Sequence, residues 1–104
     1  MKPLQRLKEY NTKGNLWIYI LFLLNKERMH AWSIQSLVEK RFGFKPGRIT
    51  AYRVLYRLRE EGFVKSEIRE RRRIYQITKK GKEQLVLARQ LYKEILNKIQ
   101  GNFK

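Results

Sequence analysis

The sequence predicts one mainly helical domain with a small β-hairpin, an α+β fold that ends in a long C-terminal helix. Three observations support this prediction. The 104 residues are enough for one domain and too few for two independent ones. Hydrophobic residues make up 42% of the chain, which is enough for a modest core. Helical periodicity covers most of the sequence, whereas β-branched and aromatic residues form strand-like runs only within residues 63–78.

The N-terminal part predicts a short helix followed by a buried one. In residues 1–12, Leu4 and Leu7 have helical spacing, and the segment "KGN" then interrupts the pattern. Residues 15–26 are apolar on nearly every side, which is typical of a helix surrounded by other elements. Asn15 is a residue type that caps helices at their start. We therefore expect residues 15–26 to form the central helix of the core.

Two helices joined by a short turn are predicted next. Gly43 is the expected stop of the first of them. Pro46, in the segment "KPG", is expected in the first turn of the following helix, at about residues 47–61, which ends at Gly62. Trp17 is expected in the core. So are the apolar residues of the helix before Gly43, namely Trp32, Ile34, Leu37, Val38 and Phe42.

A β-hairpin and a long helix complete the chain. Two short strands, at residues 63–68 and 73–78, flank the segment "RERRR" at residues 69–73, although tight hairpins usually turn on Gly, Asn or Asp. Glu70, among the arginines, has no predicted role. Thr78 is expected to cap a last helix that runs to about residue 100. The strand residues expected to hold the hairpin to the core are Val64, Ile68, Tyr75 and Ile77.

The charge of the chain is its most informative property for function. The sequence has 25 Lys and Arg residues against 9 Asp and Glu residues, a formal net charge of +16. Such a field attracts polyanions, so a small domain that carries it most often binds nucleic acid and less often an anionic membrane. The apolar run at residues 16–24 is far shorter than the roughly 20 residues of a membrane span. We expect an intracellular, cytoplasmic protein with no membrane contact, associated with the nucleoid when it binds DNA.

The predicted helix at residues 47–61 has one apolar face and one basic face. At about 100° per residue, Ala51, Tyr52 and Leu55 lie on one arc, and Arg53 and Arg57 lie on the opposite arc. Two helices joined by a short turn, followed by a hairpin, describe a winged helix-turn-helix. Its second helix enters the DNA major groove, and its wing tip, here residues 69–73, meets the backbone or minor groove. The residues expected to contact double-stranded DNA are Gln35, Lys45, Arg48, Thr50, Arg53, Tyr56, Arg57, Arg69, Arg71, Arg72 and Arg73.

Three ordered blocks of the sequence resemble the PadR-like transcriptional regulators. "HAWSI" at residues 30–34 resembles their "HGYEI", and "TAYRVLYRLREEGFV" at residues 50–64 resembles their "TLYPALRRLEEEGLV". "RRIYQITKKGKEQL" at residues 72–85 resembles "RRYYRLTEEGREEL". The resemblance covers roughly residues 14–100 and implies a homodimeric repressor on a pseudo-palindromic operator, with the last helix forming the dimer. Arg53 replaces the family's proline, so no DNA sequence preference is carried over.

Single residues match the family's motifs. Tyr52 matches the tyrosine of its recognition helix, Tyr75 matches the second tyrosine of its wing, and Arg72 and Arg73 match its basic pair. Because Tyr52 and Tyr75 also fall on packing faces, we interpret both as core residues, Tyr52 with a polar tip. Some short members of the family bind flat aromatic effectors in a dimer-interface pore beside a tryptophan of the last helix. This chain has no tryptophan there, so an effector site is not predicted.

The last helix carries an apolar stripe that recurs at alternating steps of three and four residues, the pattern of a coiled coil. About five turns of helix beyond a small domain need a partner, and we expect a second copy of the chain. We divide the chain into a DNA-binding domain at residues 1–78, with residues 1–13 as an N-terminal extension or short helix, and a dimerisation helix at residues 79–104. Leu4 and Leu7 are expected to add a second dimer contact. The expected interface residues are Leu85, Ala88, Leu91, Tyr92, Ile95, Leu96 and Ile99.

The sequence offers little for catalysis. It has one histidine, no cysteine, no phosphate-binding glycine loop and no metal-ligand cluster, so we expect neither an enzyme nor a cofactor. His30 is interpreted as structural. Two alternatives to a sequence-specific regulator remain: a sequence-indifferent chromatin or RNA-binding protein, which the charge favours, and a winged-helix protein-interaction module.

Overall fold

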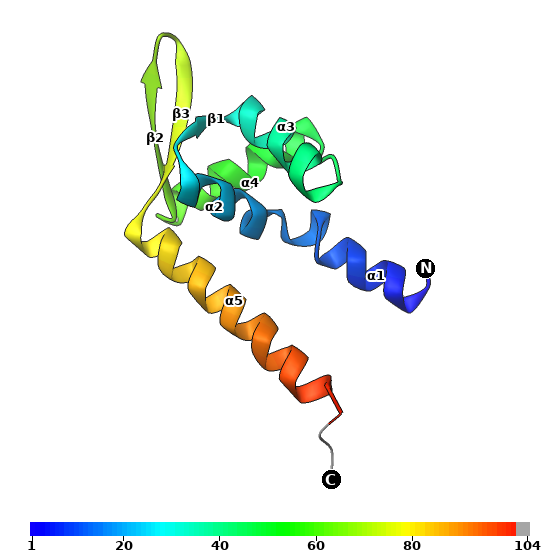
Figure 1. Ribbon diagram of the computed structural model, residues 1–104. Helices are drawn as coiled ribbons and strands as arrows, with labels where there is room; N and C mark the ends of the chain where they lie inside the picture. Colours follow the sequence, from blue (N-terminus) through cyan, green and yellow to red (C-terminus); the bar gives the residue numbers. More distant parts are fainter. Residues whose placement is uncertain (102–104) are drawn as a thin grey trace.

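The computed structural model describes residues 1–101 and contains the predicted helices and hairpin in the predicted order (Figure 1). A short helix, α1, and a 3₁₀ turn, η1, precede the buried helix α2. A strand of two residues, β1, leads into the helix pair α3 and α4, and the hairpin β2–β3 leads into the long helix α5. The bounds are α1 Pro3–Tyr10, η1 Lys13–Asn15, α2 Leu16–Lys26, β1 Met29–His30, α3 Ala31–Phe42, α4 Arg48–Glu60, β2 Val64–Arg69, β3 Arg72–Ile77 and α5 Lys79–Ile99.

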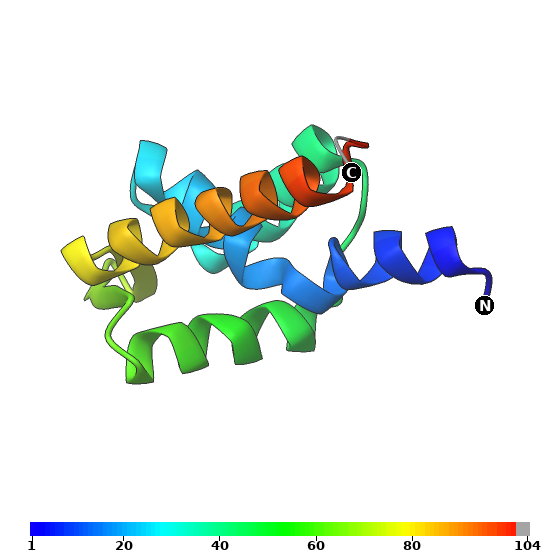
Figure 2. The same ribbon diagram turned by 90° about the horizontal axis from the view of Figure 1, so that it is seen from below.

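Helix α2 is the centre of the core, as predicted. It lies between α4 and α5, and it also packs on α3 and β3 (Figure 2). The helix carries apolar side chains on all of its sides. Burying them away from water is favourable, and the surrounding elements supply the apolar partners. The buried residues are Leu16, Ile20, Leu21, Leu23 and Leu24 of α2 together with Met29, Ile34, Val38, Ala51, Leu55, Leu58, Val64, Tyr75, Ile77 and Leu85.

The helix ends agree in part with the predicted caps. Gly43 ends α3 in the left-handed conformation with φ of 78°, as predicted. The Thr78 hydroxyl accepts a 3.1 Å hydrogen bond from the Gly81 backbone N–H, so the predicted cap of α5 is confirmed. Asn15 precedes α2, but its side chain donates back to the Tyr10 carbonyl at 2.6 Å and does not cap the helix. Pro46 is buried before α4 and lies outside its first turn, which begins after Gly47.

The hairpin belongs to a three-stranded antiparallel sheet in the order β1-β3-β2. Strand β1 was not predicted, because two residues carry no readable alternation. Val64, Tyr75 and Ile77 are buried as predicted, but Ile68 is 65% exposed and that prediction is wrong. Ile68 lies on the same face as Val64, yet this part of the hairpin projects past the helices, so no core remains for it to contact (Figure 1).

Two aromatic residues predicted to pack are on the surface. Trp32 is 58% exposed, because at about 100° per residue it points well away from Ile34 and Val38, which form the buried edge of α3. Tyr52 is 41% exposed, because it lies on the flank of α4 and not on its buried face. The prediction that both are core residues is therefore wrong, whereas Trp17 packs against the core.

The N-terminal helix is joined to α2 and α5 through one residue, Asn11. The Tyr19 hydroxyl of α2 donates to the Asn11 carbonyl, and the Tyr92 hydroxyl of α5 donates to Asn11 Oδ1 at 2.7 Å. Burial of the Tyr19 hydroxyl, and to a smaller extent the nearby Tyr92 phenol, raises the pKa of Tyr19 above its ordinary value. Beyond this junction α5 extends away from the rest of the domain (Figure 1).

The start of α5 is packed so closely on the hairpin that only glycine fits at residue 81. A Cβ at this position would lie 2.1 Å from the Phe63 carbonyl oxygen, which is a backbone atom. We predict that Gly81→Ala lowers the free energy of unfolding by about 2 kcal/mol or more, because the backbone has to move. Gly47→Ser is the matched control, since its Cβ would meet nothing closer than 3.6 Å and serine caps helices well. Equal melting temperatures for the two variants would contradict this packing.

Candidate nucleic-acid interface

Helices α3 and α4 are held at a fixed angle by the turn between them. Gln35 of α3 donates a 2.9 Å hydrogen bond from Nε2 to the carbonyl of Pro46, which is buried. Gln35 is one of the residues predicted to contact DNA, and the structure shows it half-buried and bonded to the turn. Lys45, also predicted to contact DNA, is exposed in the same turn. Helices α3 and α4 therefore form the helix-turn-helix that the sequence predicted.

The outward face of α4 is basic and aromatic. Ala51, Leu55 and Leu58 are buried, which leaves Arg53 and Tyr56 facing outward. Two arginines lie over tyrosine rings and are oriented by them: the Arg48 guanidinium is 5.8 Å from the Tyr52 ring centre, and that of Arg59 is 5.4 Å from the Tyr56 ring centre. The residues of α4 that were predicted to contact DNA are all exposed, namely Arg48, Thr50, Arg53, Tyr56 and Arg57.

One flank of α4 meets the hairpin in a notch. The notch is lined by Trp32 from the start of α3, Tyr52 from α4, and Arg72 and Arg73 from β3. His30 Nδ1 lies 3.4 Å from the Arg73 carbonyl oxygen, which ties β1 to β3 beside the notch. The notch joins the exposed face of α4 to the wing. Sequence reasoning missed Trp32 and Tyr52 as surface residues, although their angular positions on the two helices indicated it.

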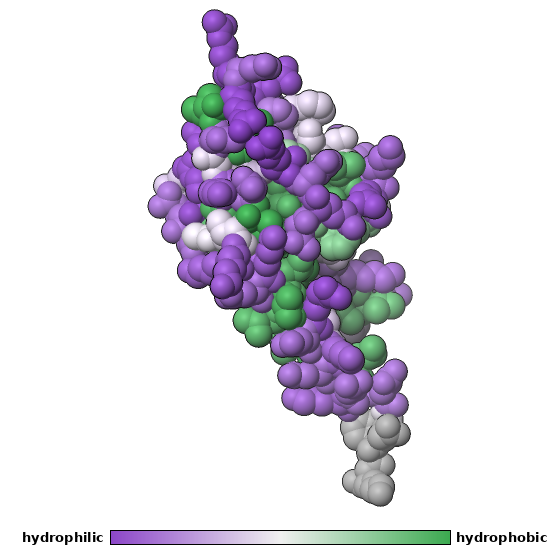
Figure 3. Space-filling view, turned by 60° about the vertical axis from the view of Figure 1, so that its left-hand side comes forward, coloured by the Kyte–Doolittle hydropathy of each residue, from purple (hydrophilic) through white to green (hydrophobic). Residues whose placement is uncertain are grey.

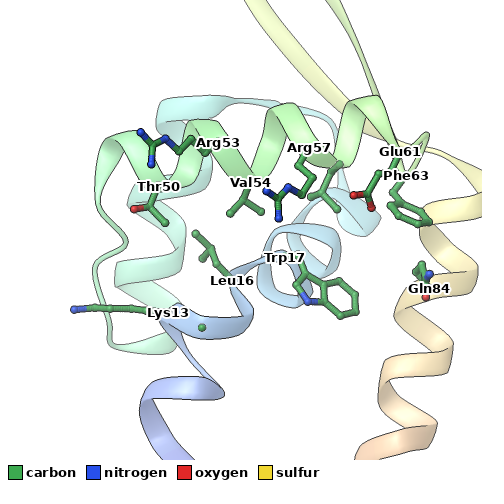
Figure 4. Close-up of a pocket in the computed structure, with 12 residues that line it drawn as sticks. Lys13, Leu16, Trp17, Thr50, Arg53, Val54, Arg57, Glu61, Phe63 and Gln84 are labelled. Atoms are coloured by element: carbon green, nitrogen blue, oxygen red, sulfur yellow. The ribbon is translucent and has the colours of Figure 1, made fainter. Parts of the chain in front are cut away.

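The other flank of α4 faces α2 and the start of α5. Figure 4 shows Thr50, Val54 and Arg57 along this flank, with Trp17 of α2 on the opposite side of a groove. Arg53 and Arg57 line both this groove and the outward face of α4, whereas Thr50 lines only the groove.

The wing tip is a two-residue turn in an unfavourable backbone conformation. Arg69 pairs with Arg72 in the sheet register, so Glu70 and Arg71 form the turn, with φ of 49° and 68°. This left-handed conformation suits Asn and Gly, and it strains other residues. Glu70, which had no role in the sequence analysis, therefore occupies the first turn position.

Two of the wing arginines have partners within the hairpin. Arg69 Nε lies 2.9 Å from Glu67 Oε1, and the Arg73 guanidinium donates to the Ser66 hydroxyl at 2.9 Å. Among residues 1–101, the structure records no such side-chain partner for Arg71 or Arg72. The wing therefore presents two oriented and two unpaired guanidinium groups.

Other kinds of site are not evident in the described part of the chain. In residues 1–101, no helix is both long enough and apolar enough to cross a membrane. Across the same residues, His, Asp and Glu side chains nowhere gather in groups of three or more that could hold a metal ion.

Comparison with known proteins places this geometry in a family. The family model described as the transcriptional regulator PadR-like family matches residues 20–86, which include α3, α4 and the wing. The chain belongs to the PadR-like family. The members of this family are transcriptional regulators that bind DNA and are not enzymes. No curated protein sequence matches the chain.

Solved structures agree with the family and the fold. This PadR-like chain is 26% identical to a PadR-like transcription factor from Bacteroides fragilis, with a TM-score of 0.77 over 91% of this chain and 96% of the other. A PadR family transcription regulator from Clostridium difficile R20291 is also 26% identical, with a TM-score of 0.70 over 82% and 97%. The winged-helix DNA-binding protein F93 from STIV is 19% identical, with a TM-score of 0.70 over 82% and 94%, and supports the fold alone.

The strained wing tip of this PadR-like protein leads to a stability prediction. We predict that the double substitution Glu70→Asn, Arg71→Gly raises the free energy of unfolding by about 1–2 kcal/mol, because both new residues accept positive φ. Denaturant unfolding of the free protein measures this change. The control, Glu70→Gln with Arg71→Gln, removes the same two charges without relieving the backbone. If the control is stabilised as much, charge and not backbone strain is the cause.

Proposed function

We propose that this PadR-like protein is a sequence-specific, homodimeric repressor that binds a pseudo-palindromic operator in double-stranded DNA. The observation that carries the proposal is the notch between α4 and β3, where Tyr52 on the flank of α4 lies beside Arg72 and Arg73 of the wing. A helix for the major groove and a wing for the adjacent backbone or minor groove then form one continuous surface. Repulsion among the wing arginines is relieved when phosphates approach.

In this proposal α4 reads bases and the wing binds the backbone. Arg53 is exposed at the centre of the outward face of α4, and arginine can pair with both acceptors of guanine. Arg71 and Arg72 at the wing tip contact phosphates, while Arg69 and Arg73, which pair with Glu67 and Ser66 on opposite faces of the hairpin, add positive charge beside them. The remaining predicted residues are proposed to contact DNA and to position α4 in the major groove. They are Gln35, Lys45, Arg48, Thr50, Tyr56 and Arg57.

The homodimer is proposed from the uncovered apolar side of α5. Leu91 is 56% exposed and Ile99 is 68% exposed, although both have an apolar side chain that gains free energy from burial. Figure 3 shows apolar side chains among polar ones along the part of the helix below the body of the molecule. Leu4 and Leu7 of α1 are uncovered as well and are proposed as a second contact. The proposed interface on α5 comprises Ala88, Leu91, Tyr92, Ile95, Leu96 and Ile99, whereas Leu85 is buried in the core of its own chain.

A sequence-indifferent chromatin or RNA-binding protein is the second candidate. The net charge of +16 favours it, because phosphate contacts alone give affinity without sequence preference. The two candidates differ in whether one DNA sequence is preferred over others at the same salt concentration.

The deciding experiment compares the DNA upstream of the protein's own gene with random DNA across a salt series. If about 6–10 phosphates are neutralised, affinity for both falls by about 10³–10⁵ between 50 and 200 mM salt, and the upstream site keeps an advantage. We predict that Arg53→Ala lowers the discrimination by about 1–3 kcal/mol, while Arg71→Ala weakens both DNAs alike and reduces the salt slope by about one unit.

Three results would change this proposal. Equal affinity for both DNAs at every salt concentration favours the sequence-indifferent candidate. Identical effects of Arg53→Ala and Arg71→Ala contradict the separate roles of α4 and the wing. Absence of binding to both DNAs refutes DNA binding.

The dimer has its own test in solution. We predict that light scattering at micromolar concentration gives twice the mass of one chain, and that Leu91→Glu with Ile95→Glu gives the mass of one chain, because two charges would have to be buried. Val86→Glu is the matched control, since Val86 is an exposed apolar residue on the opposite side of α5. A monomeric unmodified protein contradicts the proposed interface.

A further inference from the structure

Two arginines from different elements meet at one serine of the wing. The Arg73 guanidinium of β3 donates to the Ser66 hydroxyl of β2 at 2.9 Å, and the Arg59 guanidinium of α4 reaches the same oxygen at 3.4 Å. Ser66 pairs with Tyr75 in the sheet register, and Tyr75 is buried, so this face of the hairpin turns toward the helices. The three polar side chains therefore lie where α4 packs on the wing. We call Arg59, Ser66 and Arg73 the Ser66 site.

The Ser66 hydroxyl still has a proton to donate. A serine hydroxyl has two acceptor lone pairs and one O–H donor. The two guanidinium groups occupy the lone pairs, and within residues 1–101 the structure records no acceptor for the O–H. Ser66 is only half-buried, so a group from outside the protein can reach it. Because the site offers donors from all three side chains, a ligand that fits it has to accept hydrogen bonds.

The charges at the Ser66 site are unbalanced. Among the described residues, both recorded ion pairs involve Glu67, and neither includes Arg59 or Arg73. Glu67 lies on the opposite face of the hairpin from Ser66, because neighbouring residues of a strand alternate in direction. Two guanidinium groups that share one oxygen repel each other. An anion placed between them would remove this repulsion, so the site favours an anionic acceptor.

Arg59 is oriented before any ligand arrives. Its guanidinium lies 5.4 Å from the ring centre of Tyr56, and its side chain is half-buried. An oriented guanidinium loses less conformational entropy on binding, and its planar fork matches the oxygens of a phosphate. The family block "TLYPALRRLEEEGLV" has glutamate at the position of Arg59, and a carboxylate would repel a phosphate. The resemblance to the family therefore does not supply this site.

We propose that Arg59, Ser66 and Arg73 together bind one phosphate of the DNA backbone. This proposal rests on the function proposed above, in which α4 lies in the major groove and the wing lies beside it. Neither Arg59 nor Ser66 was among the residues predicted to contact DNA. Because the three side chains come from α4, β2 and β3, a single phosphate joins the recognition helix to both strands of the wing.

The first test asks whether Arg59 and Arg73 share one phosphate. Binding of the full chain to the upstream DNA is measured for Arg59→Gln, for Arg73→Gln and for the two combined. We expect each single substitution to weaken binding about tenfold, because a charge-assisted hydrogen bond is lost. The combined variant should lose clearly less than about a hundredfold, because either change alone already breaks the site.

Arg59→Gln combined with Arg71→Gln is the matched control for this coupling. Arg71 is at the wing tip and is proposed to contact a different phosphate. The two losses should therefore multiply to about a hundredfold, as they do for independent sites.

The second test uses the free protein and needs no DNA. In chloride buffer, Arg59→Gln should leave the melting temperature unchanged or raise it, because the repulsion between the guanidinium groups is removed. Inorganic phosphate, compared with chloride at equal ionic strength, should raise the melting temperature of the unmodified protein more than that of Arg59→Gln. Arg89→Gln, which changes an exposed arginine of α5, should respond to phosphate as the unmodified protein does.

Specific outcomes overturn the proposal. An unchanged DNA affinity of Arg59→Gln shows that Arg59 contacts no DNA phosphate, and a site that still responds to inorganic phosphate then belongs to a free phosphate. Losses that multiply in the Arg59→Gln, Arg73→Gln variant show two separate phosphates. A lower melting temperature of Arg59→Gln with an undiminished response to phosphate shows that Arg59 only holds the wing on α4. If the unmodified protein binds no DNA, the proposed function fails, while the response to phosphate still decides whether the Ser66 site holds an anion.

Discussion

Burial of α2 is the constraint on which the rest of the structure depends. Five of its side chains, from Leu16 to Leu24, are almost fully inaccessible, and burying each contributes about 1.5–3 kcal/mol. This gain is available only if α3, α4, β3 and α5 all pack around the helix, as they do. Because α4 contributes Ala51, Leu55 and Leu58 to that packing, its remaining side chains have to face outward. The basic surface is therefore a consequence of how the core closes.

The sequence predicted the elements with a long, regular pattern and missed those that depend on context. Helices α2 to α5 were recognisable because their apolar spacing persists over at least 11 residues. Trp32 was wrongly predicted as buried. Its hydrophobic side chain suggests a core position, but its angular position on α3 points away from the core. Ile68 was wrongly predicted as buried. The alternation of side chains along a strand indicates which face a residue lies on, but not how far along that face the helices extend.

The candidate site was predictable in composition and less so in arrangement. The arginines and the helix that carries most of them follow from the charge and the helical period. Sequence spacing does not predict which flank of α4 faces the wing and which faces α2, because this depends on where the wing and α2 lie. Sequence spacing also does not predict the left-handed backbone conformation of Glu70 and Arg71. Arginines at a turn indicate a charged tip, whereas the backbone strain is seen only in the φ angles of the structure. The wing thus keeps charge at a position where Asn and Gly would be more stable.

In the proposed dimer, the direction of α5 bears on the spacing of the two DNA half-sites. The carbonyl and the side chain of Asn11 each accept a hydrogen bond from a tyrosine, one on α2 and one on α5, so Asn11 adds to the packing of Gly81 and Leu85 in holding the direction in which α5 leaves the body. Helix α5 has 21 residues and is about 30 Å long, so a tilt of about 5° at its base moves its far end by about 2.6 Å. If α5 joins two copies as proposed, that displacement changes the separation of the two α4 helices. The angle at which α5 leaves the body would then affect which spacing of half-sites the two α4 helices can reach.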